Sequence, residues 1–238
     1  MELASILGIT VSSAAMIALL KIIAIDVILS GDNAIVIAMA TRNLPKEQQN
    51  KAIVWGTAGA VVLRILFAVI IVWLLKIPFV DIAGGLLLLF IAYKVLVGDE
   101  EDAHISAHTG LMKAIGTIIL ADVVMSLDNV VAVAGAANGH ITMIAIGVAI
   151  SIPIMIFGSK FIVMAMNKYN WIGYVGSGIL AWTAGGMILR DEQLVDFLGI
   201  TSGVVTYTII ILITILVLGA GYLAKKKAIS KRKVKQYS

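Results

Sequence analysis

Seven long apolar runs follow one another along the chain, and they constrain its fold more than any other feature. About 20 helical residues suffice to cross a hydrocarbon core ~30 Å thick, where only helices and closed barrels satisfy every backbone hydrogen bond. The composition agrees, because 61% of the residues are hydrophobic and only 13% are charged. We therefore predict an all-α polytopic membrane protein. Its seven expected spans are residues 14–40, 51–75, 79–97, 112–137, 141–166, 171–189 and 203–224.

The basic residues are unevenly distributed and predict how the chain lies in a cell (plasma) membrane. Seven of the 18 Lys and Arg residues fall in residues 225–238, directly after the last expected span. Such a segment is typical of a cytoplasmic tail that contacts anionic lipid, and its position argues against a nucleic-acid partner. Seven spans then place the N-terminus outside and the C-terminus in the cytoplasm. The inner loops receive Arg42, Lys46, Lys51, Lys94, Lys113 and Lys168, whereas the outer loops receive only Lys76 and Arg190.

A segment of 13 residues recurs with its polar residues unchanged. Residues 26–38 read DVILSGDNAIVIA and residues 122–134 read DVVMSLDNVVAVA, and every polar position is identical. Three spans per half give the two halves opposite orientations, as in many transporters. We therefore predict an inverted 3+3 repeat, made of residues 14–97 and 112–189, plus one extra seventh helix. Together they form a single transmembrane domain of residues 1–224.

The polar residues of the repeat are the expected binding site. A carboxylate at the centre of a membrane helix costs at least about 2.5–3.5 kcal/mol on insertion scales, and it usually marks an ion pathway or a paired network. Carboxylate, hydroxyl and amide oxygens suit hard cations such as Mg²⁺, Ca²⁺ and Mn²⁺. The chain has no cysteine, which excludes thiolate ligands. The predicted metal ligands are Asp26, Ser30, Asp32, Asn33, Asp122, Ser126, Asp128 and Asn129.

The position of Asp32 leaves two arrangements open. On a regular helix Asp26 and Ser30 share one face, whereas Asp32 lies roughly 120° from Asp26. Either Asp32 lines a second polar seam, or the helix breaks at Ser30–Gly31 and turns Asp32 toward the same cavity. Gly31 favours a break in the first copy, but Leu127 occupies the equivalent place in the second copy.

Arg64 is a further charged residue in the middle of an expected span, the second. It is either a fixed ion-pair partner of an aspartate, or a counter-charge that neutralises a carboxylate when the metal is absent and gates access. Four ionised aspartates around one divalent ion would leave two excess negative charges. Closely spaced carboxylates raise one another's pKa, so we expect some of them to hold protons without metal. This predicts exchange of metal for protons.

Two other features have both a structural and a functional interpretation. Glycines gather on the third and sixth expected spans, where they favour close helix packing or act as a hinge. The loop that begins GDEEDAHISAH at Gly98 is either a solvated acidic loop or a metal-sensing patch built with His104 and His108.

Both complete copies of D-x-x-x-S-x-D-N resemble the motif of the TerC family of bacterial membrane proteins. The chain is most similar to the short seven-span members of that family, over residues 1–224, and the family is itself similar to the LysE-type exporters. The resemblance implies that Mn²⁺ is the transported substrate and that it leaves the cytoplasm. Neither the choice of manganese nor the direction follows from the residues themselves.

The leading hypothesis is a secondary transporter, not an enzyme, that exports Mn²⁺ through the repeated motif by exchange with protons and needs no organic cofactor. A homodimer is compatible with it. One alternative is an exporter of another hard cation, Ca²⁺ or Mg²⁺. Others are a membrane-embedded enzyme that uses paired aspartates as acid and base, and a scaffold whose polar network only fastens helices together.

Overall fold

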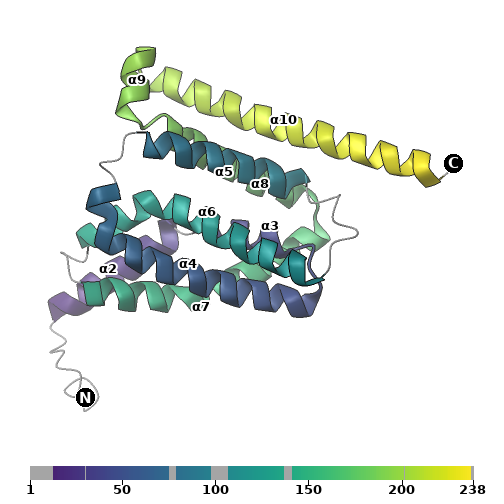
Figure 1. The fold of residues 1–238 in the computed structure, drawn as a ribbon. Coiled ribbons are helices and arrows are strands. Elements are labelled where there is room, and N and C mark those ends of the chain that lie inside the picture. Colours follow the sequence, from purple (N-terminus) through teal and green to yellow (C-terminus); the bar gives the residue numbers. More distant parts are fainter. Residues whose placement is uncertain are drawn as a thin grey trace.

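The structure, a computed structural model, describes residues 13–29, 31–74, 79–97, 107–136, 141–200 and 202–236 (Figure 1). Within these ranges the chain forms nine α-helices and no strand, which confirms the all-α prediction for this part. The helices are α2 (Ser13–Leu29), α3 (Gly31–Thr41), α4 (Lys46–Leu74), α5 (Val80–Val97), α6 (Ala107–Ala136), α7 (Ile141–Lys168), α8 (Trp171–Ile188), α9 (Glu192–Leu198) and α10 (Gly203–Gln236).

In the described part of the chain, five helices are long and apolar enough to cross a membrane. The three remaining helices that lie on expected spans fall short of this limit. Two of them, α2 and α3, have 17 and 11 residues, and α8 has several glycines among its 18 residues. The five qualifying stretches are Lys46–Phe67, Val80–Val97, Gly110–Leu127, Ile146–Lys168 and Gly203–Lys227.

The first expected span is described as α2, which ends at Leu29, and α3, which begins at Gly31. Residue 30 lies outside the described residues, so the choice between a broken helix and a second polar seam stays a prediction. In the second copy, α6 continues without interruption through the equivalent positions.

The helices lie roughly parallel in two groups, with α5, α8 and α10 on one side and α4, α6 and α7 on the other (Figure 1). α4 packs along α6, α5 packs along α8, and α2 and α3 pack on α7. α10 lies at the edge, and only 6% of its apolar stretch is buried, against 33% to 44% for the other four. The seventh expected helix is therefore peripheral.

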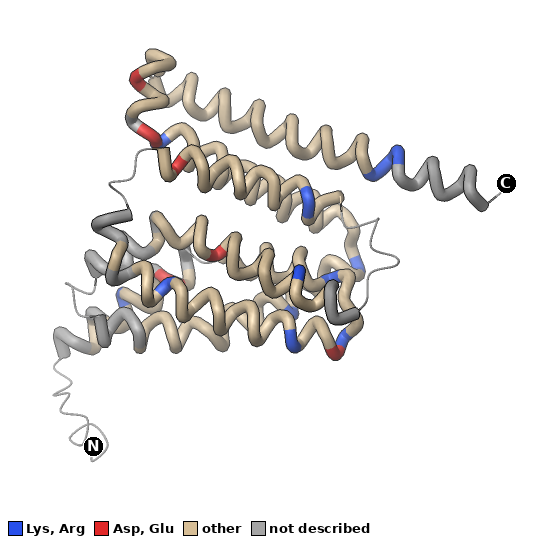
Figure 2. Tube along the Cα trace, viewed as in Figure 1, with Lys and Arg blue, Asp and Glu red and all other residues tan. Residues whose placement is uncertain are grey.

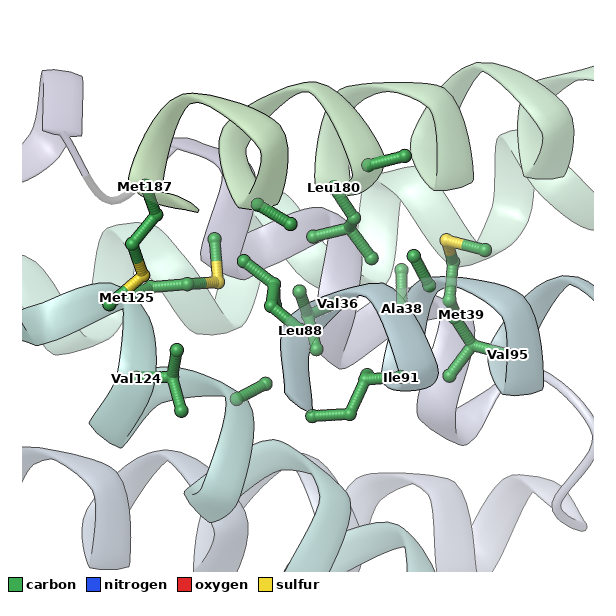
Figure 3. Packing of buried hydrophobic residues seen from close by; sticks show 14 of the residues in the cluster. Val36, Ala38, Met39, Leu88, Ile91, Val95, Val124, Met125, Leu180 and Met187 are labelled. Carbon is green, nitrogen blue, oxygen red and sulfur yellow. The ribbon is translucent and has the colours of Figure 1, made fainter. Parts of the chain in front are cut away.

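A buried apolar core forms where α3, α5, α6 and α8 meet (Figure 3). Its side chains are aliphatic residues and methionines, and the flexible methionines fill irregular gaps between helices. The core places the polar end of α3 directly beside the middle of α6. Its labelled members are Val36, Ala38, Met39, Leu88, Ile91, Val95, Val124, Met125, Leu180 and Met187.

Glycines let α5 and α8 approach each other closely. A Cβ atom added at Gly85 would lie 2.8 Å from the backbone oxygen of Ala184, a contact that real side chains do not make. Ser177 of α8 also donates a hydrogen bond to the carbonyl oxygen of Ala92 at 2.9 Å. This contact supports the interpretation that the glycines allow close helix packing.

Two details of the C-terminal part differ from the expectation. The short helix α9 was not expected; its N-terminus is capped by Asp191, which accepts from the Leu194 amide at 3.1 Å. It ends at Leu198, and the capping residue Gly199 has a φ of 63°, which is easily adopted only by glycine. In addition, α10 continues to Gln236 instead of ending at residue 224, because lysines are good helix formers.

Most of the Lys and Arg residues that the structure describes lie at one end of the bundle, where α3, α5 and α7 end and α4 and α6 begin (Figure 2). These residues are the ones that the sequence assigns to the inner loops.

Candidate functional site

Arg64 connects the two copies of the repeated motif in the interior of the bundle. It lies on α4, and only 2% of its surface is exposed. Its Nη1 donates to Asp26 Oδ1 at 2.7 Å, its Nη2 to Asp122 Oδ1 at 2.5 Å, and its Nε to Ser126 Oγ at 3.0 Å. One guanidinium group thus contacts one residue of the first copy and two of the second.

The two copies also touch directly. Asn33 Nδ2 donates to Asp122 Oδ1 at 2.8 Å. Ser126 lies one helical turn after Asp122 on α6, and its Oγ donates to Asp122 Oδ2 at 3.1 Å. The residues joined in this way form what we name the Arg64 cluster: Asp26, Asn33, Arg64, Asp122 and Ser126.

Pairing makes the buried charges of the Arg64 cluster tolerable. Asp26 and Asp122 are 0% and 6% exposed, and an unpaired charge at such a place is costly. A guanidinium carries five donors in a rigid plane, so one arginine serves two carboxylates and a hydroxyl at once. With both carboxylates ionised, the cluster holds one net negative charge.

The structure brings together four of the eight predicted ligands. Asp32 lies in the first turn of α3, close enough to Arg64 and Asp122 to interact electrostatically with both. Its Oδ1 is buried and has no hydrogen-bond partner among the described residues. Asn129 is buried on α6. Ser30 and the side chain of Asp128 lie outside the described residues, as do the loop residues 98–106 and the side chain of His108.

A small cavity adjoins the Arg64 cluster between α3, α4, α6 and α7. Its volume is about 10 Å³, about the minimum that one water needs. Asn33, Thr57 and Asp122 supply its polar lining. Within the described part of the chain, Thr57 Oγ1 and Asn33 Oδ1 are buried without a hydrogen-bond partner. The cavity therefore has two oxygen acceptors that the surrounding helices do not satisfy.

Sequence reasoning missed Thr57. A single threonine in an apolar span is unremarkable by itself, and it lies outside the repeated motif. The available signal was its spacing, because residues seven apart lie on one face of a helix. Thr57 lies seven residues before Arg64 and therefore faces the same part of the bundle.

The described side chains do not contain a preformed cluster of three or more His, Asp or Glu that could hold a metal ion. Two carboxylates do meet, but Arg64 neutralises part of their charge. A divalent cation that used both carboxylates would therefore have to replace the contacts of Arg64.

Comparison with known proteins places the chain among membrane proteins of one family. Residues 11–229 match the family described as integral membrane protein TerC. The chain belongs to the TerC family. The membrane protein YjbE of Bacillus subtilis is 46% identical to this chain over 207 residues, which cover 87% of this chain and 95% of YjbE.

Two more distant relatives are longer than the part that matches. YkoY of Bacillus subtilis is 28% identical over 213 residues, covering 78% of this chain and 65% of YkoY. The inner membrane protein YoaE of Escherichia coli K12 is 25% identical over 171 residues, covering 63% of this chain and 33% of YoaE. The names of all three relatives state a membrane location and no substrate. No solved structure matches the chain.

Proposed function

We propose that this TerC family protein is a secondary transporter that exports Mn²⁺ from the cytoplasm, and that it is not an enzyme. The observation that supports the proposal is the contact between the two copies of the motif: Asn33 meets Asp122, and Arg64 bridges Asp26 and Asp122. Oxygen ligands from both halves thus lie at one buried place. Hard cations prefer such ligands, and the choice of Mn²⁺ rests on the family resemblance.

In this proposal Arg64 is the counter-charge of the metal-free site. An entering divalent ion takes over Asp26 and Asp122 from the guanidinium, and Asn33 Oδ1, Ser126 Oγ and water complete the coordination. Two carboxylates balance one divalent ion, whereas Arg64 balances only one of them. The divalent ion therefore neutralises the two carboxylates more completely than Arg64 does. Arg64 leaves the carboxylates when the ion binds.

Protons are the proposed exchange ion. Asp32 is a candidate carrier among the described residues, because its Oδ1 is buried and lacks a hydrogen-bond partner. A protonated carboxyl tolerates such surroundings far better than a carboxylate. Asp128, the equivalent of Asp32 in the second copy, would carry a proton in the other half of the protein.

The proposed architecture has seven spans in an inverted 3+3 repeat with α10 as the extra helix, as in the LysE-type exporters. α2 and α3 together would form the first span and α8 the sixth. The basic end of the bundle faces the cytoplasm of the cell, so the N-terminus is outside, and the basic tail contacts anionic lipid. We propose a homodimer as the assembled form.

The test is metal flux in liposomes that contain the purified protein. We expect the wild-type protein to transport Mn²⁺, and we expect this transport to stop when the pH gradient is collapsed. Asp122→Asn should abolish the flux, whereas Asp196→Asn, which changes an exposed carboxylate on α9, should not. Faster flux of Ca²⁺ or Mg²⁺ than of Mn²⁺ would favour the alternative exporter. If the folded wild-type protein transported no cation, the transporter proposal would be wrong, and the scaffold and the enzyme would be the remaining interpretations.

A further inference from the structure

Met155 brings a thioether to the small cavity beside the Arg64 cluster. It lies on α7 and is 5% exposed. The polar residues on the same cavity lining are Asn33 of α3, Thr57 of α4 and Asp122 of α6. Because the cavity measures about 10 Å³, which is the space of roughly one water, an ion inside it would lie close to all four side chains. The α7 wall therefore offers sulfur where the other three walls offer oxygen.

The other buried methionines that the structure describes have different surroundings. They belong to the apolar core and are Met39, Met125, Met166 and Met187. Figure 3 shows three of them among aliphatic side chains, where methionine fills gaps between helices. Met155 is not part of that core, and its neighbours around the cavity include an amide, a hydroxyl and a carboxylate. Gap filling in an apolar core therefore does not account for its position.

The face of α7 that carries Met155 is buried over two turns. Ser151 and Ser159 lie four residues before and after Met155, and both are 0% exposed. The Ser151 hydroxyl donates to the carbonyl oxygen of Gly147 at 3.1 Å. The Ser159 hydroxyl donates to the carbonyl oxygen of Ile156 at 3.0 Å. Both hydroxyl protons are thus used within α7, and Met155 is the α7 residue on the described lining of the cavity.

A thioether distinguishes two classes of divalent ion. Ca²⁺ and Mg²⁺ take oxygen ligands, whereas transition-metal ions also accept the softer sulfur of methionine. A site built from oxygen atoms alone suits Mn²⁺, Ca²⁺ and Mg²⁺ alike. One sulfur among these oxygens fills a coordination position that Ca²⁺ and Mg²⁺ use poorly. Their affinity therefore falls relative to the affinity of a transition-metal ion.

We propose that Met155 selects transition-metal ions over Ca²⁺ and Mg²⁺ in this protein. Its sulfur contacts an ion in the small cavity, and Asn33, Thr57 and Asp122 supply oxygen ligands to the same ion. The inference rests on the proposed function, because it requires a divalent cation at the site beside Arg64. It adds a reason for a transition-metal substrate that is independent of the family resemblance.

The test is inhibition of Mn²⁺ uptake into liposomes that contain the purified full chain. Cd²⁺ and Ca²⁺ are nearly equal in size, but Cd²⁺ is much softer, so comparing them separates sulfur binding from cavity size. We expect Cd²⁺ to inhibit the wild type at a lower concentration than Ca²⁺. Met155→Leu keeps the volume but removes the sulfur, and it should reduce this Cd²⁺ preference about tenfold. Met166→Leu, the control on the same helix in the apolar core, should keep the preference.

A second variant exchanges the sulfur for an oxygen. Met155→Gln should lower the KM for Ca²⁺ relative to the KM for Mn²⁺ about fivefold, whereas a change in packing alone would shift both KM values together. Unchanged Cd²⁺ preference in Met155→Leu, with Mn²⁺ uptake intact, would overturn the role of Met155 and leave the proposed transport standing. Equal inhibition of the wild type by Cd²⁺ and Ca²⁺ would have the same meaning. A wild type that transports no cation would overturn both proposals.

Discussion

Arg64 shows how much a single residue can organise in a membrane interior. Its sequence position indicates only that a positive charge lies in the middle of a span and must have a partner. The structure identifies the partners as Asp26 and Asp122, one from each copy of the repeat. This choice is not local, because the three residues lie on three different helices and meet only after those helices pack.

Removal of Arg64 should destabilise the metal-free protein and strengthen its response to metal. Arg64→Gln leaves two buried carboxylates without their counter-charge, and loss of one partner of a buried pair costs about 3–5 kcal/mol. Because Mn²⁺ can replace the missing charge, we expect the melting temperature to fall without Mn²⁺ and to rise more with Mn²⁺ than in wild type.

The matched control is Lys51→Gln on the same helix. Its ammonium lies 3.6 Å from Glu47, and both side chains are mostly exposed, so we expect a change below about 1 kcal/mol. An Arg64→Gln variant that melts like wild type in both conditions would show that the ion pair is not a metal-sensitive element.

Thr57 should contribute to metal affinity although it lies outside the motif. Thr57→Val keeps the shape and removes the hydroxyl that lines the small cavity beside Asp122, whereas Thr57→Ser keeps an oxygen. If the cation enters this cavity, the KM for Mn²⁺ should rise about tenfold in Thr57→Val, equivalent to one hydrogen-bond-sized interaction of about 1.4 kcal/mol, and change little in Thr57→Ser. Equal KM values in the two variants, measured by flux into liposomes, would assign Thr57 to packing alone.

At the scale of helices, the sequence predicted the positions of the long apolar helices well and missed a short one. Each of the seven apolar runs is helical in the described residues, because a run of apolar residues in lipid has to satisfy its own backbone. The helix α9 escaped prediction because seven residues are too few to show a periodic pattern.

The contact between α5 and α8 should tolerate no side chain at Gly85. Gly85→Val would press a Cβ against the Ala184 carbonyl oxygen, and because that atom belongs to the backbone it cannot turn aside. We expect a loss of about 1–3 kcal/mol, seen as a lower melting temperature of the detergent-solubilised protein. Gly186→Val, at an open position on α8, should differ from wild type by much less; similar losses in both variants would point to helix propensity instead of packing.

For the whole molecule, the uneven distribution of Lys and Arg is the sequence signal that bears on orientation in the membrane. The bundle collects these residues at one end (Figure 2), as it must if one end faces the cytoplasm. The chain has no cysteine, so single cysteines can report the orientation without background.

Cysteine labelling should place Ser202 outside the cell and Asn170 inside. The two positions flank α8 and α9, and both are exposed. A membrane-impermeant maleimide should label Ser202→Cys in intact cells and Asn170→Cys only after permeabilisation, with the cysteine-free wild type as the control. Labelling of both positions from the same side would show that α8 does not cross the membrane.

The sequence by itself determined that the chain is a bundle of membrane helices, where these helices lie, and which polar residues are paired by a repeat. These properties depend on hydropathy and on spacing along one helix, which are local. Only the tertiary structure decided that Arg64 joins Asp26 to Asp122, that Thr57 lines a cavity beside them, and that Gly85 of α5 lies against the backbone of α8. Such contacts depend on how helices far apart in the sequence pack, and packing is set by the shapes of many side chains together.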